Sequence, residues 1–138
     1  MSAPAPQTFT AGECWAYRAP KGFERSRIII GAVVSPNENE QIVCCAVERA
    51  PRRLSDGRIE TVTIPFLPMA QSALAVSVEA RDGHGDVPAG FQSAFDHWLN
   101  DPKGLTMFTV PFEGWLETLI ARQMASIVQL AKPNDGSP

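Results

Sequence analysis

The sequence is poor in the residues and motifs that mark the common kinds of active site. It has three cysteines, two histidines and one tyrosine. It lacks the glycine-rich nucleotide-binding motifs, the HExxH motif of zinc proteases, the GxSxG motif of hydrolases and any CxxC pair. These absences argue against nucleotide-binding enzymes, zinc proteases and common hydrolases, and we expect no cofactor.

Long apolar runs are also missing. The longest, residues 28–34 with one glycine inside, is far shorter than the roughly 18–20 residues that a membrane helix needs. The first ten residues have neither the positive flank nor the apolar middle of a secretory signal. We therefore expect a cytoplasmic protein that does not enter a membrane.

What the sequence does have is the composition of one folded domain. Of its 138 residues, 44% are hydrophobic and 20% are charged, with 12 Lys and Arg against 15 Asp and Glu, a net charge of −3. A chain of this length buries on the order of 70% of its unfolded surface, enough for a core without disulfides or metal. We expect one domain over residues 9–131, with disordered ends at 1–8 and 132–138, where prolines and turn formers gather.

The three cysteines, Cys14, Cys44 and Cys45, are an odd number, and two of them are neighbours in a segment with strand character. Neighbouring residues of a strand point to opposite faces of the sheet. We therefore expect free, buried thiols rather than a disulfide or a metal site.

The first half of the chain has the pattern of antiparallel strands. Residues 13–17 and 58–66 alternate in polarity, whereas residues 26–34 and 41–48 are β-branched and apolar on both faces. Turn formers separate these segments, including Ser55, Asp56 and Gly57 before the last of them. Four strands joined by short turns predict a meander.

The second half has helical periodicity. Apolar residues at helical spacing predict helices over 68–80, 88–100 and 112–130, with a turn at 82–86 and a short strand at 106–110. Strands followed by helices indicate an α+β protein. We expect an antiparallel, four- to five-stranded curled sheet or an SH3-like barrel, packed by about three helices.

One glycine-rich segment brings Asp82, His84 and Asp86 together. Two carboxylates and an imidazole at this spacing are suited to holding a divalent metal or to placing a proton-transferring histidine. The same residue types also form an ordinary helix-breaking turn. We favour the turn and keep the three residues as metal candidates.

Residues 49–58 contain the clearest charge feature. Arg49, Arg52, Arg53 and Arg58 stand against a single acid, Asp56, so this segment carries +3 and the rest of the chain −6. Clustered guanidinium groups grip phosphates well, which suggests a polyanion site. The acidic balance of the whole chain argues instead for a solvated hairpin, and against nucleic acid as the partner.

The last predicted helix has the longest apolar stripe of the chain. Apolar residues at such spacing usually belong to the core. Part of this stripe is nevertheless suited to packing against a second copy of the chain. We name Trp115, Leu119, Met124 and Ile127 as candidate interface residues.

Short motifs give two resemblances. The opening GxxWxY motif, Gly12 to Tyr17, together with Phe112-Glu113-Gly114-Trp115, resembles a family of small uncharacterised bacterial proteins, which implies no activity. The first forty residues are also similar to SH3-like-barrel toxins of bacterial toxin–antitoxin systems, which cleave RNA or poison gyrase. Those toxins have Arg-Pro where this chain has Arg27-Ile28, so no catalytic residue is carried over.

These observations predict a non-catalytic binding or protein-interaction module. Its expected partners are another protein or, through the last helix, a second copy of the chain. The alternative is a polyanion-binding protein or a toxin-like, RNA-acting enzyme that uses the four arginines of residues 49–58.

Overall fold

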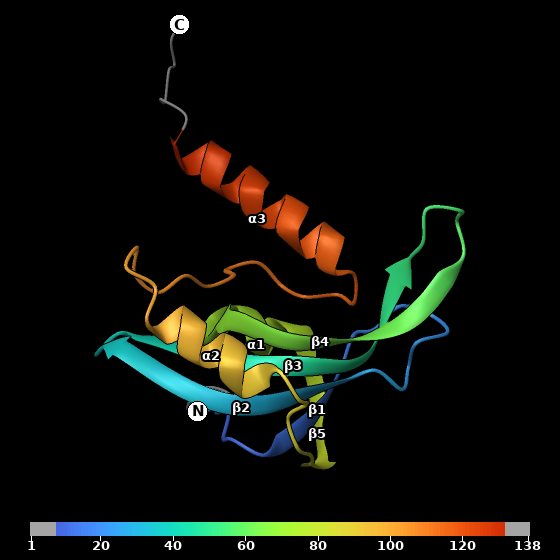
Figure 1. Cartoon of the computed structure of the whole chain (residues 1–138), viewed down its shortest axis with the longest axis horizontal. Helices are drawn as coiled ribbons and strands as arrows, with labels where there is room; N and C mark the ends of the chain where they lie inside the picture. Colours follow the sequence, from blue (N-terminus) through green and yellow to red (C-terminus); the bar gives the residue numbers. More distant parts are fainter. Residues whose placement is uncertain (1–7, 132–138) are drawn as a thin grey trace, which may run out of the picture.

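The computed structural model describes residues 8–131. Its strands form one antiparallel five-stranded sheet in the order β4-β3-β2-β1-β5 (Figure 1). The strands are β1 (Glu13–Tyr17), β2 (Arg27–Asn37), β3 (Glu40–Arg53), β4 (Ile59–Ala70) and β5 (Val78–His84). The helices are α1 (Gln71–Ser77), α2 (Phe91–Leu99) and α3 (Leu116–Ala131). The predicted α+β class and the curled sheet are confirmed.

The sheet is open. Its edge strands are β4 and β5, and no pairing joins them within the described residues. A closed SH3-like barrel, the other predicted form, is therefore not what this part of the chain builds. The ends predicted to be disordered lie outside the described residues, apart from Thr8.

Two hydrophobic clusters, one on each face of the sheet, explain why the apolar middle parts of β2 and β3 show no alternation. Neighbouring β3 residues point to opposite faces, so Cys45 joins one cluster and Cys44 the other, and both are fully buried. Residues of α1 and the start of α3 cover the first face, and α2 covers the second. The central strands are thus enclosed on both sides, as their sequences predict.

The segment predicted as a helix over 68–80 differs most from expectation. Strand β4 continues to Ala70, α1 occupies only 71–77, and β5 begins at Val78. Pro68 lies opposite Cys44 in the β3–β4 ladder, and its carbonyl accepts a hydrogen bond from the Phe108 N–H at 2.9 Å. Val78 is β-branched and adopts an extended conformation that ends the helix. The predicted turn at 82–86 is correspondingly displaced, because β5 runs through His84.

The last helix starts later than its apolar pattern predicts. Gly114 has a φ of 108°, a left-handed conformation that favours glycine and interrupts the predicted helix before Leu116. Phe112 is fully buried in the core ahead of the helix. The predicted strand at 106–110 is reduced to one bridge, between Met69 and Phe108.

Candidate interaction surface

The predicted arginine segment forms the outer part of the β3–β4 hairpin, which extends beyond the rest of the sheet (Figure 1). Its four arginines do not act as one group. At the tip, the Arg58 guanidinium lies 2.6 Å from the Asp56 carboxylate, whereas Arg52 approaches Glu60 only to 3.9 Å. Arg49 has a φ of 56° and makes no ion pair with a described residue.

Arg53 turns towards the start of α3. Its guanidinium carbon lies 5.3 Å from the centre of the Trp115 ring, a cation–π arrangement. The same indole meets the Phe23 ring edge to face, with centroids 6.3 Å apart. Three segments that are distant in the sequence therefore meet beside the outer part of the hairpin.

Helix α3 is anchored by its first turns and exposes much of the rest. Leu119 is buried in the core, and Leu116 packs against it. Further along, Gln123 accepts hydrogen bonds from the N–H and the hydroxyl of Thr109, at 2.8 and 3.3 Å. Figure 1 shows the helix on the far side of the 100–115 segment from the sheet.

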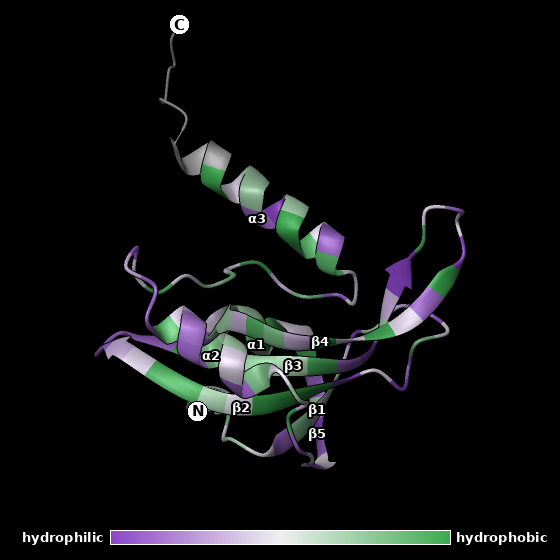
Figure 2. Cartoon of the chain, viewed as in Figure 1, coloured by the Kyte–Doolittle hydropathy of each residue, from purple (hydrophilic) through white to green (hydrophobic). Residues whose placement is uncertain are grey.

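The exposed side of α3 is apolar. Ile120, Met124 and Ile127 are 46%, 57% and 49% exposed. In the stretch 116–127, five of the seven exposed residues are Ile, Met or Ala, and the two charged ones are Glu117 and Arg122. Apolar positions recur along the helix in Figure 2. The predicted interface residues include Met124 and Ile127 but not Ile120. Its helical spacing from Met124 and Ile127 would have placed it on the same face.

Two of the predicted interface residues lie elsewhere. Leu119 is 1% exposed and belongs to the core, and Trp115 is half-buried beneath Arg53. The helical period shows which residues share a face of α3. Because apolar residues lie on more than one face of this helix, periodicity alone does not decide which face meets the sheet. The structure assigns Leu119 to the core and Met124 to the surface.

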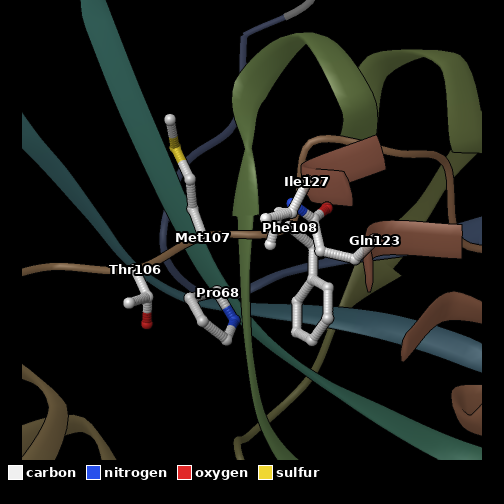
Figure 3. A pocket seen from close by; sticks show the side chains of 6 residues that line it. All are labelled: Pro68, Thr106, Met107, Phe108, Gln123 and Ile127. Carbon is white, nitrogen blue, oxygen red and sulfur yellow. The ribbon is translucent and has the colours of Figure 1, made fainter. Parts of the chain in front are cut away.

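Two cavities border α3, one at its middle and one at its start. The first, of about 280 Å³, is mostly apolar and is lined by Pro68, Thr106, Met107, Phe108, Gln123 and Ile127 (Figure 3). The second, of about 330 Å³, separates the hairpin from the start of the helix and is lined by Pro51, Arg52, Arg53, Leu116, Glu117 and Ile120. We call them the apolar hollow and the arginine groove.

The predicted metal residues do not form a ligand set. Asp82 accepts a 2.7 Å hydrogen bond from Arg27 Nε and makes an ion pair with it, and His84 lies opposite Glu13 in the β1–β5 ladder. Across residues 8–131, no group of three His, Cys, Asp or Glu side chains is placed to hold a metal ion. The exposed end of an edge strand accounts for this cluster.

Glu13 is the one buried acidic side chain among the described residues. Burial acts to raise the pKa of Glu13, but hydrogen bonds from the Thr10 N–H, Trp15 Nε1 and Arg81 outweigh it and hold the pKa below its ordinary value. This carboxylate fastens the turn before β1 to the edge strand β5. Its hydrogen bonds give it a structural role, and it lines neither of the two cavities beside α3.

The thiols are also structural. Burial raises the pKa of Cys44 to about 12 and raises the pKa of Cys45 still further, and the Cys45 thiol donates to the Leu67 carbonyl at 3.3 Å. Burial likewise raises the pKa of the half-buried Cys14. Because the thiolate is the reactive form, none of the three is activated as a nucleophile.

Comparison with known proteins adds no further constraint. No family model, no curated protein and no solved structure matches this chain. The two resemblances noted from the sequence stay predictions. None of the described helices is long and apolar enough to span a bilayer.

Proposed function

We propose that the protein is a non-catalytic protein-interaction module that pairs with a second copy of itself through α3. The observation that carries this proposal is the exposure of Ile120, Met124 and Ile127 at about half of each side chain, beside an apolar hollow. Water contact with three large side chains on one helix face is unfavourable. A partner that covers this face removes that cost.

Binding rather than catalysis is supported by the state of the chemical groups. The thiols have raised pKa values, Glu13 is held by three hydrogen bonds, and the described residues offer no three-membered metal cluster. Active sites need titratable groups that converge on a cavity. Both cavities beside α3 are instead lined mainly by apolar residues and arginines.

A second copy fits this face because a two-fold dimer brings the same surface of both copies together. That surface must therefore carry both a protrusion and a depression. Met124 and Ile127 are exposed on α3, and Ile127 also lines the hollow formed with Pro68, Met107 and Phe108. The charged residues among the exposed ones of 116–127 are Glu117 and Arg122, which have opposite signs, so two copies would meet with little net repulsion.

The expected dimer is weak. Only three large side chains of each copy are exposed on this face, which is a small contact beside the large apolar interfaces of obligate dimers. We therefore expect a dimer that dissociates on dilution and not an obligate one.

Sedimentation velocity from about 1 to 200 μM tests this proposal. We expect the wild type to shift from monomer to dimer over this range, and Met124→Lys to remain monomeric because the substitution places a charge in the interface. Leu99→Lys is the matched control: Leu99 is 40% exposed on α2, which covers the opposite face of the sheet.

The control should dimerise like the wild type. A wild type that stays monomeric at every concentration, or a Leu99→Lys variant that loses the dimer equally, overturns the proposal. Leu119→Glu is unsuitable as the interface variant because Leu119 lies in the core, and the charge would unfold the protein.

A further inference from the structure

We infer that the arginine groove binds an acidic, aliphatic segment of a partner protein. The groove shares Ile120 with the proposed dimer face, but its arginines lie on the β3–β4 hairpin, so the inference does not rest on the dimer. Three observations support it: guanidinium groups with spare donors, an apolar lining, and one carboxylate that limits how much negative charge the groove accepts.

Arg53 is held in place for an anion. Its guanidinium lies over the Trp115 ring at 5.3 Å, and Trp115 is braced by Phe23. A guanidinium stacked on its flat face keeps its N–H groups directed outwards along its edges. No described carboxylate makes an ion pair with Arg53, so these donors have no anionic partner within the described chain.

Arg52 is similarly available. Its nearest carboxylate, on Glu60, is 3.9 Å away, and the two side chains are 64% and 45% exposed. That separation exceeds hydrogen-bond length, so the pair is weak in water. An incoming carboxylate at a normal distance of about 2.8 Å would form the stronger, charge-assisted bond.

The rest of the groove favours a peptide over a nucleic acid. Leu116, Ile120 and the buried Pro51 supply an apolar lining that suits Leu or Ile side chains. Glu117 lies in the same groove, and the whole chain has a net charge of −3. Both disfavour the closely spaced charges of a nucleic-acid backbone more than a peptide whose carboxylates are separated by aliphatic side chains. A segment that alternates carboxylates with aliphatic side chains matches both the rim and the lining.

Arg58 provides an internal control. It belongs to the same hairpin and carries the same charge, but it does not line the groove, and its guanidinium is bound to Asp56 at 2.6 Å. Removing its charge changes the overall field of the hairpin as much as removing that of Arg52. The substitutions of Arg52 and Arg58 should therefore differ in their effect on binding only if the ligand contacts Arg52 directly.

Fluorescence anisotropy with three labelled probes tests the inference: a peptide of alternating Glu and Leu, its Gln and Leu counterpart, and a single-stranded oligonucleotide. We expect the Glu and Leu peptide to bind at least about tenfold more tightly than either other probe. Arg52→Gln should weaken that binding about five- to tenfold and the double variant Arg52→Gln, Arg53→Gln further, with Arg58→Gln within about twofold of the wild type.

Each variant is first checked by its thermal unfolding. If removing the contact between Arg53 and Trp115 disturbs the fold of the double variant, the single variant Arg52→Gln still provides the test. Equal affinity for the Glu and Gln peptides, or equal losses for Arg52→Gln and Arg58→Gln, overturns the inference. Tighter oligonucleotide binding with a steep salt dependence also overturns it and assigns the hairpin to nucleic acid. Met124→Lys should bind the peptide like the wild type even when it has lost the dimer.

Discussion

Gly31 leaves the space that the Phe91 ring occupies. A Cβ atom at Gly31 would lie 2.3 Å from the Phe91 Cζ, far inside van der Waals contact. Gly31 falls at an irregularity of the β2–β3 ladder, between Ile30 and Ala32. This close approach lets the first residue of α2 sit against the middle of β2 and so sets the position of the helix on the sheet.

We expect Gly31→Ala to destabilise the protein by about 1–3 kcal/mol, because the added methyl group must displace a buried ring. Urea unfolding measures the free energy. The double variant Gly31→Ala, Phe91→Leu should lose less stability than the sum of the two single changes, since the smaller side chain relieves the collision. Strict additivity would show that the two residues are not in conflict.

Glu13 provides the second residue-scale prediction, a dependence of stability on pH. The folded pKa of Glu13 lies below its ordinary value of 4.5, because the hydrogen bonds of Thr10, Trp15 and Arg81 outweigh the effect of burial. Around and below pH 4.5 the unfolded state therefore binds more protons than the folded state. The stabilising contribution is fully present above the unfolded pKa and is lost as the pH falls through the folded pKa.

Urea unfolding of the wild type and of Glu13→Gln between about pH 3 and pH 8 measures this contribution. The stability difference should be largest near neutrality and should shrink steadily below about pH 4.5. Arg81→Gln, which removes the 60% exposed partner of the pair, should have a much smaller effect at every pH. A difference that is constant across the range would contradict this role of the carboxylate.

Among the elements, α1 and the segment before α3 are joined by one hydroxyl group. Ser77 Oγ donates to the Ala73 carbonyl at 2.8 Å and accepts from the Phe112 N–H at 2.9 Å, and the side chain is 2% exposed. It therefore connects the end of the short helix to the residue that fills the core before α3.

Ser77→Ala leaves the Phe112 N–H buried without a partner, and we expect a loss of about 1–3 kcal/mol. Ser72→Ala on the same helix is the matched control and should change stability by less than about 0.5 kcal/mol, because Ser72 is exposed. Thermal and urea unfolding of the three proteins provide the comparison. Equal stability of the two variants would mean that the hydroxyl bridge contributes nothing.

The sequence predicts elements well where burial leaves a regular pattern. The four N-terminal strands are confirmed, although β2, β3 and β4 are longer than predicted, and helices occur in all three predicted regions. Strand β5 was missed because only its first residue, Val78, is buried, so an exposed edge strand shows no alternation. The early start predicted for α3 followed from Phe112, whose apolar character serves the core and not the helix.

At the scale of the whole molecule, the candidate surface depends on tertiary contacts that a linear pattern does not contain. The charge count of residues 49–58 identifies the arginines, but only the structure separates Arg58, bound at the tip, from Arg53, stacked on Trp115. Similarly, the helical period identifies the α3 stripe, and docking of Leu119 decides which of its faces remains outside. The candidate surface therefore depends on tertiary placement more than on composition.

The strand order also bears on how the chain is assembled during synthesis. Strands β1 to β4 pair with their neighbours in sequence, whereas β5 returns to the far side of β1, where Glu13 and Arg81 meet across 68 positions of chain. A ribosome must therefore release the chain through β5 before β1 gains its second neighbour. Until then the N-terminal strand presents a bare edge, and closing so long a loop is slow. Nascent chains halted before β5 should be the ones most in need of a chaperone.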